Sequence, residues 1–227
     1  MKNKVADSSA RRTAIIVGAL YIAGTVSGAF SVVLTGGLLN APVDFVKVSD
    51  NANAMILGAL LVLTMGLSLA MIPVLMYPIL KKQNETLAMG YVVFRSALET
   101  FTYLITVVTF LQLLTLSQAY VQAGTLAASA FQAYGAVLVD MKMIGCITTI
   151  IFIIGALMFY SLLFKSKIIP RWISGWGLVS ALPYITSGIL VLFGVIGNNS
   201  TMQTILYLPL AVQEMVLGIW LIAKGFD

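Results

Sequence analysis

The sequence predicts an all-α polytopic membrane protein, a bundle of six transmembrane helices with both termini in the cytoplasm. Three observations support this fold class. Hydrophobic residues make up 60% of the 227 positions and charged residues only 9%, whereas soluble domains have about 45–50% and about 25%. The apolar residues fall into six runs, each near the roughly 20 residues that a helix needs to cross a bilayer. Basic residues gather on one side of these runs. We expect residues 1–227 to form a single membrane domain.

The six predicted transmembrane helices cover residues 13–35, 53–80, 87–114, 143–164, 173–196 and 202–223. The first follows Arg11 and Arg12, as the apolar part of a signal peptide would. Its apolar run is longer than the roughly 7–15 residues of such a segment, so we interpret it as a retained helix.

The distribution of lysine and arginine predicts the orientation. Ten of these residues lie in the terminal segments and in the loops after the second and fourth predicted helices. Only Lys47 and Lys142 lie on the opposite side, and Arg95 lies within a helix. Because cytoplasmic loops are enriched in basic residues, both termini are predicted to be cytoplasmic, in a multi-pass protein of the plasma membrane.

The net charge of +5 does not indicate nucleic-acid binding. The basic residues lie at the ends of apolar runs, where anionic lipid headgroups are found, rather than in one groove or arm. The partner that the charge predicts is therefore the lipid bilayer.

One outer loop is unusually long. Residues 115–142 contain no charge between Leu116 and Val139, and they carry Tyr120, Phe131 and Tyr134. Aromatic residues of this kind suit a segment at the membrane interface. The sequence leaves open whether this segment forms its own surface helix or extends the fourth helix.

Polar residues at membrane depth are the main candidates for a functional site, because they are costly there. The third helix carries Arg95 and Glu99, which lie four residues apart on one helical face. The sixth carries Gln213 and Glu214 near its middle, at about the depth of Glu99. We therefore expect the third and sixth helices to meet inside the bundle. Whether Arg95 pairs with Glu99, Glu214 or both stays open.

One arginine beside two carboxylates leaves a surplus negative charge. Arginine stays charged, and burial disfavours an unpaired carboxylate. We expect one carboxylate to pair with Arg95 and the other to be protonated, or to be neutralised by a cation or a ligand amine. Pro209 lies five residues before Glu214, where a bend of the helix would open a polar cavity or would simply be a fixed kink.

Several chemistries are excluded by composition. The chain has no histidine, which removes histidine haem ligation, histidine zinc sites and Ser-His catalysis. No phosphate-binding loop of the G-x-x-x-x-G-K-[ST] type occurs. We predict no catalytic residue, no metal and no cofactor.

Three functions remain. The leading hypothesis is the binding or transport of a small ligand or ion in a polar cavity between the third and sixth helices, at Arg95, Glu99, Gln213 and Glu214. The alternative is a structural or regulatory membrane protein in which the buried Arg–Glu pair only locks helices together. An intramembrane enzyme with two glutamates as acid and base ranks last.

The chain also resembles a bacterial membrane family known as domain of unknown function 4386, over nearly its whole length. The segments that carry this resemblance are RRTA at 11–14, YPILK at 77–81, LAMGY at 87–91, FR at 94–95, IPRWISGWG at 169–177 and LPLAVQEMV at 208–216. In the family the glutamate often follows the arginine by three residues, whereas Glu99 follows Arg95 by four. Both spacings keep one helical face. The resemblance implies a multi-helix protein of the bacterial inner membrane and no established activity, substrate or cofactor.

Overall fold

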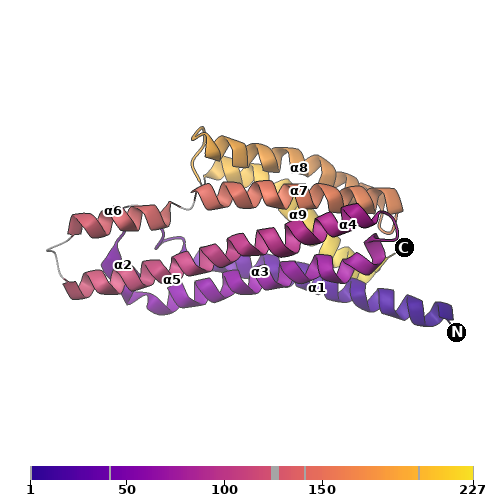
Figure 1. Ribbon diagram of the computed structural model, residues 1–227, viewed down its shortest axis with the longest axis horizontal. Helices are drawn as coiled ribbons and strands as arrows, with labels where there is room; N and C mark the ends of the chain where they lie inside the picture. Colours follow the sequence, from indigo (N-terminus) through magenta and orange to yellow (C-terminus); the bar gives the residue numbers. More distant parts are fainter. Residues whose placement is uncertain (1, 41, 124–127, 141, 199, 227) are drawn as a thin grey trace.

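The computed structural model describes residues 2–40, 42–123, 128–140, 142–198 and 200–226, and all regular structure in these ranges is helical. Six segments are long and apolar enough to cross a membrane (Figure 1). The all-helical class and the six apolar helices predicted from the sequence are therefore confirmed. The six segments are Ser9–Thr35, Ala52–Leu80, Glu85–Ala123, Ala128–Ser166, Arg171–Leu192 and Thr201–Ala223.

The second span agrees with its predicted range, whereas the first ends at the predicted residue but begins earlier. Helix α1 covers Lys2–Thr35 and α3 covers Ala52–Leu80. The loop between them contains a short helix, α2 (Phe45–Asp50), whose first turn is capped by Asp44 accepting a hydrogen bond from the Lys47 amide. Such a side-chain cap satisfies an amide that has no partner within the helix.

The third span is longer than predicted. It runs through α4 (Glu85–Tyr91), the π-helix η1 (Val92–Glu99) and α5 (Thr100–Ala123). The predicted end at residue 114 was wrong because Ser117 and the following residues continue the helix, with the Ser117 hydroxyl donating to the Leu113 carbonyl at 2.7 Å. At about 1.5 Å per residue the helical run is roughly 58 Å long, well beyond a bilayer core of about 30 Å.

The long outer loop is largely helical. After the end of α5, a separate helix α6 (Ala128–Val139) lies beside α5 and in line with α7 (Lys142–Ser166) (Figure 1). This arrangement favours an extension of the fourth span over a helix lying flat on the membrane. Residues 124–127 of the predicted loop lie outside the described residues.

The last two spans are α8 (Arg171–Leu192) and α9 (Thr201–Ala223). Helix α8 ends four residues before the predicted position because Gly194 has a φ of 70°, which is characteristic of helix ends. The Val195 amide then donates to the Leu190 carbonyl at 2.8 Å. Helix α9 is capped by Ser200, whose hydroxyl accepts from the Gln203 amide.

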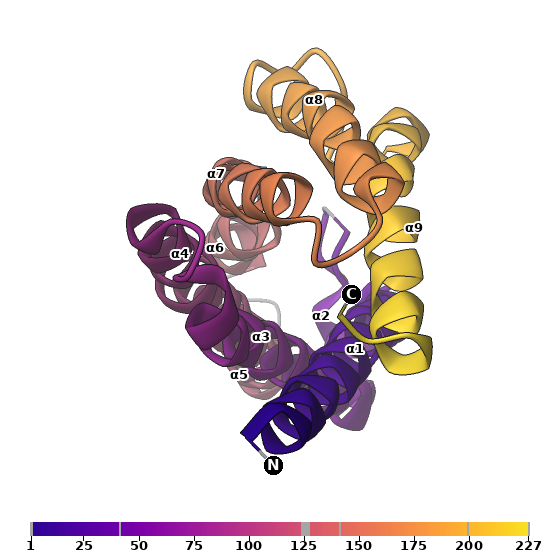
Figure 2. The same ribbon diagram turned by 90° about the vertical axis from the view of Figure 1, so that its right-hand side faces the viewer.

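The six spans pack in a ring. The order around it is α1, α3, the third span, α7, α8 and α9, which returns to α1 (Figure 2). Glycines permit the closest approach between α1 and α9, since a Cβ on Gly18 would collide with the Gly218 carbonyl oxygen. Gly24 and Gly28 lie against Leu69 and Met65 of α3. Small residues of this kind let membrane helices pack closely.

The outside of the ring is apolar. Val33 is 77% exposed and Val179 is 68% exposed, and many other large hydrophobic side chains face outward from all six spans. A soluble surface does not carry so much contiguous apolar area, whereas lipid solvates it well. The six long apolar helices and their apolar outer surface indicate a multi-pass membrane protein.

Arg11 connects the first and last helices of the ring, α1 and α9. Its guanidinium donates to the carbonyls of Leu221, Ile222 and Ala223, at 3.1, 2.7 and 3.3 Å. These are carbonyls of the last turn of α9, which have no amide partner within the helix. A basic side chain at a helix C-terminus supplies donors and a favourable charge.

Replacing Arg11 with alanine should therefore lower the free energy of unfolding by about 1 kcal/mol, because hydrogen bonds and a favourable charge at a helix end are lost. Thermal unfolding in detergent would measure the change as a shift of a few degrees. Arg12 is exposed and provides the matched control, Arg12→Ala, for which little change is expected. Equal effects of the two variants would contradict the capping role.

Candidate functional site

The buried charges meet at one guanidinium. Arg95 Nη1 donates to both carboxylate oxygens of Glu99, at 2.9 and 3.0 Å, and Nη2 donates to Oε1 of Glu214 at 3.0 Å. The side chains of Arg95 and Glu99 are 3% and 1% exposed, and that of Glu214 is 15% exposed. Arg95 thus pairs with both glutamates, which the sequence had left open.

The π-helix η1 holds two of the three charges. Arg95 and Glu99 both lie within this eight-residue segment. The segment is attached to α3 by the Ser96 hydroxyl, which donates to the Ala70 carbonyl at 2.6 Å. On its other side, α7 approaches closely at Gly155, where a Cβ would lie 3.3 Å from Cβ of Phe94. Short π segments inside α-helices are rare and often occur at functional sites.

The two glutamates differ in their hydrogen bonding. Glu99 accepts two hydrogen bonds from Arg95, and its Oε1 also accepts one from the Tyr103 hydroxyl at 2.6 Å. Glu214 accepts one hydrogen bond, at Oε1. Within the described residues no donor is found for its second oxygen, Oε2. Glu99 is therefore a fully bonded counterion, whereas Glu214 keeps an available carboxylate oxygen.

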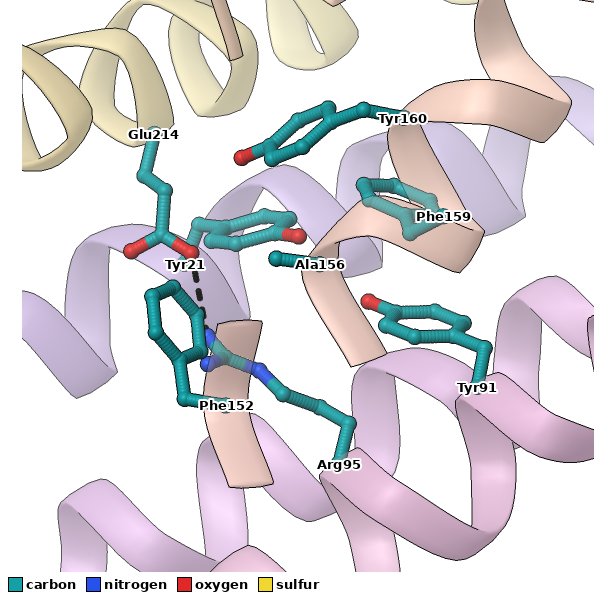
Figure 3. Close-up of a pocket in the computed structure, with 8 residues that line it drawn as sticks. All are labelled: Tyr21, Tyr91, Arg95, Phe152, Ala156, Phe159, Tyr160 and Glu214. Atoms are coloured by element: carbon teal, nitrogen blue, oxygen red, sulfur yellow. Dashed lines mark hydrogen bonds and ion pairs between the residues drawn. The ribbon is translucent and has the colours of Figure 1, made fainter. Parts of the chain in front are cut away.

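Glu214 and Arg95 border a space enclosed mainly by aromatic side chains (Figure 3). The gaps between the atoms there have no room for a water molecule. The remaining side chains around this space, which we call the aromatic pocket, are Tyr21, Tyr91, Phe152, Ala156, Phe159 and Tyr160.

Two of the rings make specific contacts. The guanidinium carbon of Arg95 lies 4.4 Å from the centre of the Phe152 ring, an arrangement in which the face of the ring attracts the cation. Tyr91 is stacked on Phe159 with ring centres 4.5 Å apart. The Tyr91 hydroxyl is buried and makes no hydrogen bond of normal geometry within the described part of the chain. The Tyr21 hydroxyl faces it across the pocket (Figure 3).

Gln213 does not join the charge cluster. Its Oε1 accepts a hydrogen bond from the Tyr160 hydroxyl at 2.6 Å, and its Nε2 donates to the Ile173 carbonyl at 3.0 Å. It thus connects α9 to α7 and α8 and holds the Tyr160 ring at the border of the pocket. Adjacent residues on a helix point in different directions, which explains why Gln213 and Glu214 have separate partners.

The tyrosines of this site were not predicted from the sequence. Tyr91, Arg95, Glu99 and Tyr103 recur every fourth residue, and this spacing could have indicated a polar row along the third span. No comparable signal marks Tyr21 or Tyr160, because their place beside Glu214 depends on how distant helices pack.

The pairing of Arg95 with Glu99 can be tested by a mutant cycle. Arg95→Met should lower the free energy of unfolding by about 3–5 kcal/mol, because two buried carboxylates lose their partner. Adding Glu99→Gln to that variant should recover part of the loss, although Glu99→Gln alone should destabilise the protein. Denaturant unfolding in detergent would measure all three variants. Additive losses would contradict the buried pair.

The comparisons with known proteins identify a family but no activity. No curated protein and no solved structure matches the chain. The model of the family described as domain of unknown function (DUF4386) matches residues 16–225, which is nearly the whole length. The resemblance seen in the sequence motifs is thereby confirmed, and the chain belongs to the DUF4386 family.

Proposed function

We propose that this membrane protein binds a small ligand or ion at Glu214, between the third and sixth spans, and exchanges it with the solution. The observation that carries the proposal is the unequal bonding of the two glutamates. Glu99 is saturated by Arg95 and Tyr103, whereas Glu214 is partly exposed and has one oxygen without a donor among the described residues. In this function Arg95 is the fixed positive charge and Glu214 the exchangeable group.

The Tyr91 hydroxyl supports the same proposal, because Tyr21 is its one hydrogen-bonding partner in the described part of the chain and the geometry of that contact is poor. A buried polar group whose hydrogen bonding is incomplete loses part of the roughly 1–3 kcal/mol that a full bond would save. Such groups often mark a position where a bound species completes the hydrogen bonding. The hydroxyl borders the same pocket as Glu214, so one small ligand would contact both groups.

A helix lock without a ligand is the second candidate. It is favoured by the packing, because η1 packs on α3 and α7 while α9 packs on α1 and α8. The Arg95–Glu214 ion pair therefore connects two helices on opposite sides of the ring. An enzymatic function has less support, since both glutamates bind the same guanidinium instead of flanking an open cleft.

We further propose that the protein lies in the plasma membrane with both termini in the cytoplasm. Both termini lie at one end of the molecule, together with the loops between α3 and α4 and between α7 and α8 (Figure 1). These are the segments that carry ten of the 13 basic residues, and basic residues favour the cytoplasmic side.

The ligand and lock functions give different outcomes for Glu214→Gln. We expect native mass spectrometry of the protein, released from mild detergent, to detect a bound species of defined mass that Glu214→Gln loses. Glu85→Gln, which changes an exposed glutamate at the start of α4, should retain it. If all forms are empty and Glu214→Gln is less stable by about 3–5 kcal/mol, the lock is correct.

The orientation can be tested with single cysteines in a Cys146→Ser background. Asn40 and Gln83 are exposed at opposite ends of the molecule. A membrane-impermeant maleimide should label Asn40→Cys in intact cells and Gln83→Cys only after lysis. The opposite labelling pattern would place the termini outside.

A further inference from the structure

The aromatic pocket has the composition of a site for an organic cation. Five aromatic rings surround it: those of Tyr21, Tyr91, Phe152, Phe159 and Tyr160. The faces of such rings attract ammonium groups, and cages of aromatic rings recognise them in many proteins. Arg95 already shows this behaviour, since its guanidinium lies over the Phe152 ring.

The charges near Glu214 are unbalanced. The titratable groups close enough to interact electrostatically with it are Tyr21 on α1, Tyr91 on α4, Arg95 and Glu99 on η1, Tyr160 on α7 and Tyr184 on α8. Arg95 is the one cation among these groups, and its charge is shared with Glu99. An ionised Glu214 would leave one surplus negative charge among mostly buried side chains, and such a charge needs a compensating positive one.

From these observations we infer that the pocket binds a small organic ammonium ion in exchange for a proton on Glu214. This inference rests on the proposed function and names the class of its ligand. In the closed pocket the Glu214 carboxyl carries a proton, so that Arg95 and Glu99 balance each other. When the ammonium ion enters, this proton leaves to the solution and the carboxylate pairs with the ligand. The net charge of the pocket is the same in both states.

Metal ions fit the same pocket poorly. Hard cations such as Ca²⁺ or Mg²⁺ take about six to eight oxygen ligands, or keep several of their waters. The described residues around the pocket offer too few oxygen ligands for such an ion, because both Glu99 oxygens are already bonded. A primary ammonium group needs fewer partners. It would donate to the free oxygen of Glu214 and to the Tyr91 hydroxyl, with the aromatic rings around its carbon atoms.

Entry of the ligand requires the aromatic rings to separate. Tyr91 and Phe159 fill the pocket as a stacked pair, so one of these rings must turn away. Helix α9 contains Pro209, five residues before Glu214, and proline removes a backbone hydrogen bond from the preceding turn. A bend at this position would move Glu214 away from Arg95 and widen the pocket.

The test measures ligand binding and proton release together. Ethylammonium chloride is titrated into the purified protein in weakly buffered detergent solution with a pH indicator, and calorimetry measures the affinity. We expect ethylammonium to raise the melting temperature and to release one proton for each ion bound. Ethanol, an uncharged molecule with the same number of heavy atoms, and sodium chloride should do neither. Glu85→Gln should behave as the unaltered protein, and Glu214→Gln should lose both signals.

Tyr91→Phe is a second variant, which keeps the charges and the aromatic ring and removes only the hydroxyl. It tests the inference even if Glu214→Gln does not fold. Loss of one hydrogen bond should weaken ethylammonium binding by about tenfold without changing the proton count. Binding without proton release, or equal effects of sodium and ethylammonium, would overturn the inference. A neutral or acidic species bound through Glu214 in native mass spectrometry would also overturn it while leaving the proposed function intact.

Discussion

The buried guanidinium of Arg95 is the interaction on which the arrangement of this protein depends. It lies inside the ring of helices, binds carboxylates from opposite sides and rests on the Phe152 ring. Arginine suits this place because its planar group carries several donors in a fixed geometry and stays charged. A lysine would offer a single point charge and could not hold two carboxylates in this way. The neighbouring helices are positioned so that both Nη atoms of this one cation bind a carboxylate.

The π-helix η1 allows the third span to direct Arg95 and Glu99 into the ring. Along η1, Arg95 and Glu99 are directed into the ring, while Ser96 bonds to α3 and Gly155 of α7 approaches the backbone from the other side. A regular helix directs each residue by a constant rotation, and a π segment changes that rotation locally. The charged row can therefore face the centre while the rest of the span keeps its packing against α3 and α7.

Much of this protein can be predicted from its sequence, because lipid imposes simple rules on helix length and charge. The six apolar helices follow from the apolar runs of the sequence. The proximity of Arg95, Glu99 and Glu214 follows from the position of these charges within two of the runs. The end of the third span at Ala123 was not predicted, because α5 continues as a helix through the uncharged residues 115–123. The sequence also did not indicate the π-helix, which is a change in hydrogen-bond partners, nor the separate role of Gln213, which depends on the position of Tyr160.

The ion pair between Arg95 and Glu99 on one helix also has a consequence for biosynthesis. Each charged side chain costs about 2.5–3.5 kcal/mol when a helix enters the membrane, and two opposite charges four residues apart can enter as a neutral pair. Glu214 follows Arg95 by 119 residues, which corresponds to roughly 6–24 seconds of synthesis at about 5–20 residues per second. The third span is therefore complete before α9 is synthesised. During this interval Glu99 neutralises Arg95. The ring closes last, when α9 packs against Arg11 and Gly18 of α1 and its Glu214 binds Arg95.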